Sequence, residues 1–213
     1  MTFLSRLLGQ QKKPESELPS WHIATASGRS LEIVLFTGEI TNAPADAICT
    51  STNPRLSLMA GTGGAVRDRA GFGMKRECEA IIAAERERTG REELLPGSAH
   101  VTSAGMLDYK ALIHCIASDH SHHSSPEIVR LCVTNALAAA ERAGCESVAM
   151  PPFGAGHAAL PFEVSLAAII AALRESSSSV RRVVIVVLQK NRAREAAAIL
   201  EGMLGERREK SEG

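Results

Sequence analysis

The chain has 213 residues, a length that fits one α/β domain with a sizeable core and short extensions. Lysine and arginine together number 24, as do aspartate and glutamate, so no net basic field exists to gather nucleic acid or an anionic membrane. The five cysteines are scattered and form no CxxC pair, which argues against a disulfide framework or a cysteine zinc site. This cysteine pattern, together with the lack of a signal-peptide or transmembrane pattern, leads us to expect a cytoplasmic protein.

The first twenty residues differ in composition from the rest of the chain. Four apolar residues between Phe3 and Leu8 lie at helical spacing, and a polar stretch with two prolines follows them. Two interpretations are open: a short amphipathic helix that docks on a membrane or a partner protein, and a frayed terminus. We therefore expect an arm at 1–20, a domain at 21–204, and a charged tail at 205–213.

Strands alternate with helices after an opening hairpin. In chain order, the apolar patterns predict strands at 21–26, 31–36 and 45–51, a helix at 66–87, strands at 99–103 and 111–117, a helix at 126–142, a strand at 147–150, a helix at 162–176, a strand at 183–188, and a helix at 193–204. This order predicts a three-layer α/β/α fold with a mixed, mostly parallel sheet of about six or seven strands. Ligands of such sheets bind outside the carboxyl ends of the strands.

Glycine-rich loops follow three of the predicted strands. Gly154 and Gly156 can adopt positive φ angles, so that backbone N–H groups face an anion without interference from a Cβ. The glycines at 61–64 precede a helix and provide a second set of such donors. Each loop alone is equally typical of a plain connection, but two anion sites in one cleft suit a diphosphate.

Six segments, taken in order, resemble the motif series of the macrodomain family, which binds ADP-ribose. They are GEIT at 38–41, TSTN at 50–53, GTGGAV at 61–66, GSAHVT at 97–102, IH at 113–114, and PPFGAGHAALP at 151–161. The resemblance runs from about residue 21 to about residue 204. It implies a macrodomain-like fold and a ligand that is ADP-ribose or an ADP-ribosylated acceptor. It implies no metal or tightly held cofactor, because backbone amides and helix termini can neutralise the diphosphate.

The resemblance also implies roles for individual residues. Glu39, with Gly38 and Ile40 beside it, falls where the family binds the adenine amine, although an exposed turn carboxylate is the alternative. Asn53 falls where the family holds the distal ribose, although Asn-Pro is also a common turn start. Thr50 replaces the first Asn of that motif. The diphosphate-binding positions are Gly61, Thr62, Gly63, Gly64, Val66, Phe153, Gly154, Ala155, Gly156 and His157.

The same alignment of motifs bears on catalysis. Gly63 stands where ADP-ribosyl hydrolases of the family carry an Asp, and glycine has no side chain to accept a proton or orient a water. Ala158 and Ala159 also depart from the family pattern. We therefore expect a module that binds ADP-ribose. The alternatives are a hydrolase of ADP-ribosyl or O-acetyl-ADP-ribose esters, with Asn53 orienting the ribose and backbone groups holding the water, and a scaffold without nucleotide binding. His157 is a candidate substitute proton carrier, but we expect a partly exposed loop histidine without a chemical role.

Two further groups have the composition of a reactive site. His120, His122 and His123 lie close to Asp119, but a serine-rich stretch fixes no metal geometry, so we expect a solvated loop or cleft rim. His114 and Cys115 are neighbours on a predicted strand and therefore point to opposite faces of the sheet. We expect both in or near the core.

Overall fold

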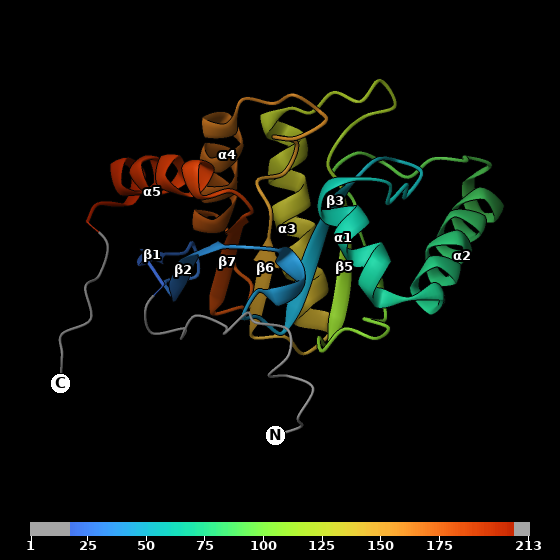
Figure 1. Ribbon diagram of the computed structural model, residues 1–213, viewed down its shortest axis with the longest axis horizontal. Coiled ribbons are helices and arrows are strands. Elements are labelled where there is room, and N and C mark those ends of the chain that lie inside the picture. Colours follow the sequence, from blue (N-terminus) through green and yellow to red (C-terminus); the bar gives the residue numbers. More distant parts are fainter. Residues whose placement is uncertain (1–17, 207–213) are drawn as a thin grey trace.

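The computed structural model describes residues 18–206, so the segment 1–17, which carries most of the predicted arm, and residues 207–213 of the predicted tail lie outside the described residues (Figure 1). The strands are β1 (Ser20–Ala24), β2 (Ser30–Thr37), β3 (Ala47–Thr52), β4 (Ala99–Thr102), β5 (Ala111–Ile116), β6 (Ser147–Met150) and β7 (Arg182–Val187). The helices are the 3-10 turn η3 (Ile40–Asn42), α1 (Gly61–Ala70), α2 (Phe72–Thr89), α3 (Pro126–Arg142), α4 (Phe162–Arg174) and α5 (Lys190–Leu204).

The seven strands form one sheet in the order β1-β2-β7-β6-β3-β5-β4. The inner strands β2, β7, β6, β3 and β5 run parallel, whereas β1 and β4 are antiparallel to their neighbours at the two edges. This arrangement confirms the predicted mixed, mostly parallel sheet. The carboxyl ends of β6, β3 and β5 lie side by side, because these three strands are neighbours in the sheet.

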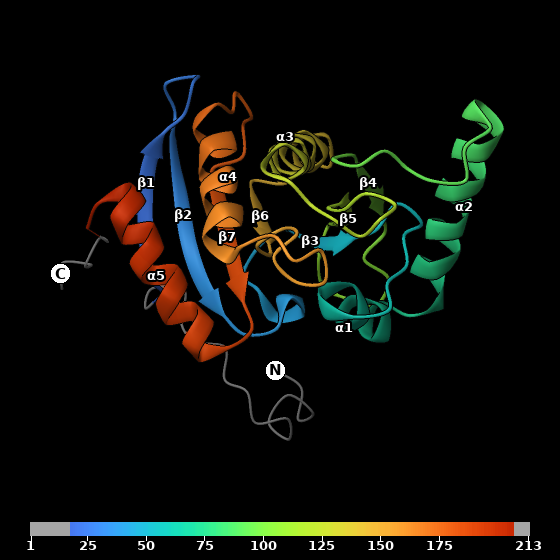
Figure 2. The same cartoon turned by 90° about the horizontal axis from the view of Figure 1, so that it is seen from above.

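Helices cover both faces of the sheet, and each face has its own apolar core (Figure 2). Helices α3, α4 and α5 pack on one face, while η3, α1 and α2 pack on the other. Along β2, Ile33 and Leu35 enter the first core, and Val34 and Phe36 enter the second. This alternation is the period of two that strand geometry imposes, and it confirms the three-layer α/β/α fold.

The predicted helix 66–87 is wrong in two respects. The segment forms two helices that meet at Gly71, whose φ of +84° ends α1. The carbonyl of Ala70 accepts a hydrogen bond from the N–H of Met106 at 3.1 Å, so a distant loop occupies the position where the helix would continue. In addition, α1 begins at Gly61 rather than at Val66, so the glycine-rich segment is itself the first turn of a helix.

Within the described part of the chain, no helix combines the length and the apolar character needed to cross a membrane.

Candidate functional site

A pocket of about 490 Å³ opens at the carboxyl edge of the sheet, where β3 and β6 end. Five segments line it: the end of β3, the loop from β3 to α1, the first turn of α1, the stretch that follows β5, and the loop after β6. Its volume lies within the roughly 300–1,000 Å³ that is usual for small-molecule sites. The position agrees with the rule that parallel sheets bind ligands beyond their strand ends.

The first turn of α1 presents unpaired backbone donors beside this pocket. Within residues 18–206, the N–H groups of residues 61–63 donate to no protein acceptor, and no side chain caps the helix at Ala60. The hydroxyl of Thr62 instead accepts a hydrogen bond from the N–H of Ser51 at 3.2 Å, which fixes α1 against β3. The start of α1 therefore offers a partial positive charge and free donors to an anion.

The loop after β6 presents a second set of donors. Among the residues that the structure describes, the N–H groups of Gly154, Gly156 and His157 bond to no protein acceptor, and all three residues line the pocket. Gly154 has a φ of +73°, and a Cβ at this position would overlap the side chain of Ser124. Glycine is therefore required here both by backbone conformation and by space.

Asn53 shapes its loop and lines the pocket at the same time. Its side-chain oxygen accepts hydrogen bonds from the N–H groups of Arg55 and Ser57, each at 3.1 Å. This is the bonding of an Asx turn, so Asn53 acts as the turn former, while its contact with the distal ribose stays a prediction. The side-chain NH₂ group makes no hydrogen bond within the described residues, so it remains as a donor for a ligand.

Gly38, Glu39 and Ile40 follow β2 at the same edge of the sheet, but they do not line the pocket. The N–H of Gly38 donates to the carbonyl of Val187 at 3.0 Å, and Ile40 is buried. A carboxylate oxygen of Glu39 lies 2.5 Å from Nη2 of Arg69, near the end of α1, and both side chains are partly exposed. The structure therefore brings together two of the three glycine loops around one pocket and leaves the third beside α1.

The pocket contains no negative charge. Its described lining residues include no aspartate or glutamate, and two histidines, His122 and His157, are its titratable side chains. Unpaired N–H groups on two sides, without a carboxylate among them, favour an anionic ligand held by the backbone.

Comparison with known proteins identifies the family. The model of the Macro domain family matches residues 49–169. This chain is a member of the Macro domain family.

Relatives and solved structures agree with this macrodomain assignment. The chain is 28% identical over 147 residues to the human protein mono-ADP-ribosyltransferase PARP14, a match that covers 68% of this chain but 8% of that protein. It is 31% identical over 121 residues to the O-acetyl-ADP-ribose deacetylase of Cronobacter turicensis, covering 56% of this chain and 65% of that enzyme. The crystal structure of the Trypanosoma brucei macrodomain in complex with ADP-ribose superimposes with a TM-score of 0.68 at 20% identity, over 92% of this chain and 81% of that chain.

Several predicted site residues in this macrodomain serve packing rather than the pocket surface. Val66 and Phe153 are buried, and Gly63, Gly64 and Ala155 do not line the pocket. A Cβ at Gly63 would lie 3.2 Å from the Cα of Leu58 and 3.1 Å from its Cδ2. The position at which the resemblance implies a hydrolase Asp is therefore tightly packed, and a side chain there would require Leu58 to shift.

A buried polar network supports β3 of the macrodomain beneath the pocket. His114 on β5 is fully buried, and its ring nitrogens lie 2.9 Å from the hydroxyls of Thr50 and Thr102. Burial, assisted by the charge of His100, lowers the pKa of His114 to about 4, so the ring is neutral at pH 7.

Cys115 lies on the opposite face of β5, in the core that α3, α4 and α5 cover, as the strand alternation predicts. Burial raises the pKa of its thiol well above the ordinary value, with Cys132 and Cys49 as thiol neighbours. Such a thiol is an inert core group rather than a nucleophile.

The segment after β5 contributes pocket residues that the motif series did not indicate. Ser118 and His122 line the pocket, and His122 has a φ of +61°. Oδ1 of Asp119 accepts hydrogen bonds from the N–H groups of Ser121 and His123, which folds this segment into a tight turn. Residues 18–206 contain no group of three His, Cys, Asp or Glu side chains arranged to hold a metal ion.

Proposed function

We propose that this macrodomain binds ADP-ribose, free or attached to an acceptor, in the pocket between α1 and the loop after β6. The observation that carries the proposal is the convergence of unpaired N–H groups on one cavity without carboxylates; they belong to Gly61, Thr62, Gly154, Gly156 and His157. A diphosphate carries the charge and the acceptor oxygens that such donors require. The Trypanosoma brucei macrodomain, which has the same fold, was solved in complex with ADP-ribose, and this supports the choice of ligand.

In the proposed complex the diphosphate lies between the start of α1 and the Gly154 loop. The NH₂ group of Asn53 donates to a hydroxyl of the distal ribose, since its oxygen already belongs to the Asx turn. The adenine extends along α1 toward Glu39, where the resemblance locates the base. The ion pair with Arg69 holds one carboxylate oxygen of Glu39, so the adenine amine competes with this pair for the carboxylate.

Calorimetric titration tests this proposal with the variant Asn53→Asp. An aspartate still accepts the two hydrogen bonds of the Asx turn, so the loop keeps its shape, but it loses the NH₂ donor and adds a negative charge. We expect ADP-ribose affinity to fall by about tenfold or more. The matched control Asn191→Asp makes the same charge change on α5, outside the pocket, and should bind as the wild type does. Absence of ADP-ribose binding by the wild type would overturn the proposal.

A second candidate function is hydrolysis of O-acetyl-ADP-ribose or of an ADP-ribosyl ester. The observation in its favour is the 31% identity to the Cronobacter turicensis deacetylase, together with two histidines in the pocket. Because Gly63 supplies no carboxylate, His122 or His157 has to handle the proton. Incubation with O-acetyl-ADP-ribose decides the matter: turnover that His122→Gln or His157→Gln abolishes would establish an enzyme, whereas unchanged substrate supports binding alone.

We also propose that the protein works in a reducing compartment such as the cytoplasm. The five cysteines are free and buried, so the fold makes no use of disulfides. We expect the same thermal stability with and without dithiothreitol. A loss of thermal stability in its presence would contradict the proposal.

A further inference from the structure

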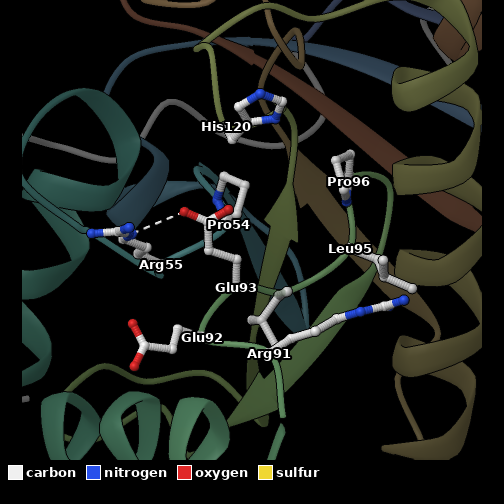
Figure 3. Close-up of a pocket in the computed structure, with 9 residues that line it drawn as sticks. Pro54, Arg55, Arg91, Glu92, Glu93, Leu95, Pro96 and His120 are labelled. Atoms are coloured by element: carbon white, nitrogen blue, oxygen red, sulfur yellow. Dashed lines mark hydrogen bonds and ion pairs between the residues drawn. The ribbon is translucent and has the colours of Figure 1, made fainter. Parts of the chain in front are cut away.

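A second pocket, of about 380 Å³, is lined by the loop after β3 and by the stretch between α2 and β4 (Figure 3). Asn53 lines the first pocket, while Pro54 and Arg55 line the second. In the same way His122 lines the first pocket and His120 lines the second. Two chain segments thus contribute to both pockets, so the second pocket lies close to the Asn53 end of the first one. A group joined to a ligand at that end would extend into the second pocket.

The far wall of the second pocket is the stretch between α2 and β4. The N–H of Leu94 donates to the carbonyl of Pro54 at 2.8 Å, which ties this stretch to the loop after β3. Pro54, Leu95 and Pro96 give the pocket an apolar side, and Leu95 is 54% exposed. An exposed leucine next to a proline at the rim of a cavity suits contact with the aliphatic part of a peptide.

The charges around the second pocket leave one cation without a close partner. Nε of Arg55 lies 3.0 Å from Oε1 of Glu93, and Glu92 lies 3.6 Å from Nη2 of Arg86. Arg91, by contrast, has no ion-pair partner within 4 Å among residues 18–206, although its charge helps to lower the pKa of the Glu85 carboxyl from a longer distance. Its side chain extends away from the Arg55–Glu93 pair (Figure 3). A carboxylate is the group that an unpaired guanidinium binds best among protein side chains.

We propose that the second pocket receives the acceptor segment of an ADP-ribosylated protein and favours an acidic residue next to the modified one. Arg91 pairs with the acidic side chain, and the peptide backbone lies against Pro54 and Leu95. This inference rests on the proposed function, because the acceptor reaches the second pocket only when the ADP-ribosyl group occupies the first. In this proposal the second pocket distinguishes one ADP-ribosylated acceptor from another, because the ADP-ribosyl group is the same in all of them.

Binding measurements with three probes test the proposal: free ADP-ribose, a mono-ADP-ribosylated peptide with glutamates beside the modified residue, and the same peptide with glutamines instead. A non-hydrolysable linkage keeps the peptides intact. We expect the wild type to bind the glutamate peptide about fivefold more tightly than the glutamine peptide. Arg91→Glu should abolish that preference and leave the affinity for free ADP-ribose unchanged. The matched control Arg76→Glu changes an exposed arginine of α2 that lines neither pocket and should keep the preference.

The outcomes separate this inference from the function on which it rests. Binding of free ADP-ribose together with equal affinities for the two peptides would overturn the inference alone, as would a preference that survives Arg91→Glu. A failure of the wild type to bind free ADP-ribose would overturn the proposed function and the inference together. An equal loss of affinity for all three probes in Arg91→Glu would also count against the inference, since it would indicate damage to the first pocket.

Discussion

Acidification should destabilise this protein chiefly through one fully buried side chain, His114. The imidazole is fully buried, and each ring nitrogen lies 2.9 Å from a threonine hydroxyl, Thr50 on β3 or Thr102 on β4. A neutral ring donates to one hydroxyl and accepts from the other, which satisfies the site. Protonation adds a charge that burial keeps away from solvent, and the nearby carboxylate of Glu77 offsets only part of that cost, so the folded state resists it.

The size of the effect follows from the pKa of His114, which is lowered from 6.5 to about 4. The unfolded chain binds the proton more tightly than the folded chain does. The free energy of unfolding is therefore greatest above pH 6.5 and decreases as the pH falls through the interval from 6.5 towards about 4. The complete shift corresponds to roughly 3 kcal/mol, of which about 2 kcal/mol is already lost near pH 5.

Urea denaturation of the wild type and of His114→Gln, at about pH 7 and about pH 5, isolates this contribution. Carboxylates that titrate in the same interval affect both proteins and cancel in the difference. We expect the wild type to lose about 2 kcal/mol more than the variant between the two conditions. An equal loss in both proteins would refute the reasoning. A proton resonance of the His114 ring that titrates near pH 6.5 in the folded wild type would refute it independently.

Three further substitutions follow from the packing of the site. Gly154→Val should weaken ADP-ribose binding by about tenfold or more, because a side chain there overlaps Ser124 and the φ of +73° disfavours it; unchanged calorimetric affinity would contradict this. Gly63→Asp should lower the free energy of unfolding by about 1–3 kcal/mol through contact with Leu58, without creating ADP-ribosyl hydrolysis; a gain of turnover would be the contrary result. Glu39→Gln should change stability by less than about 1 kcal/mol, since its ion pair is half exposed, and a larger loss on denaturation would show a buried role.

Local sequence patterns predicted the order of strands and helices and the layered fold, because apolar periodicity reports directly on burial. The break at Gly71 escaped prediction, since it depends on a hydrogen bond between Ala70 and Met106, which are far apart in the sequence. A glycine within an apolar helical pattern can lie inside a continuous helix, or it can end the helix. The prediction of one helix failed for that reason.

The sequence indicated the parts of the candidate site that depend on backbone N–H groups. It did not indicate the parts that depend on the order of the strands in the sheet. The glycines at 61–64 and 154–156 marked the two sets of donors, because glycine spacing is visible in the sequence. Ser118 and His122 line the pocket only because β5 lies next to β3, and local pattern does not encode that adjacency. The pairing of Glu39 with Arg69 likewise needs the packing of η3 against α1.

The claim that backbone amides bind the ligand is tested most directly by amide ¹H–¹⁵N spectra recorded during titration with ADP-ribose. The account predicts that the largest shifts occur at the N–H groups of residues 61–63, 154, 156 and 157, which have no protein acceptor in the described structure. Shifts confined to other parts of the molecule, or unchanged spectra at saturating ADP-ribose, would contradict it.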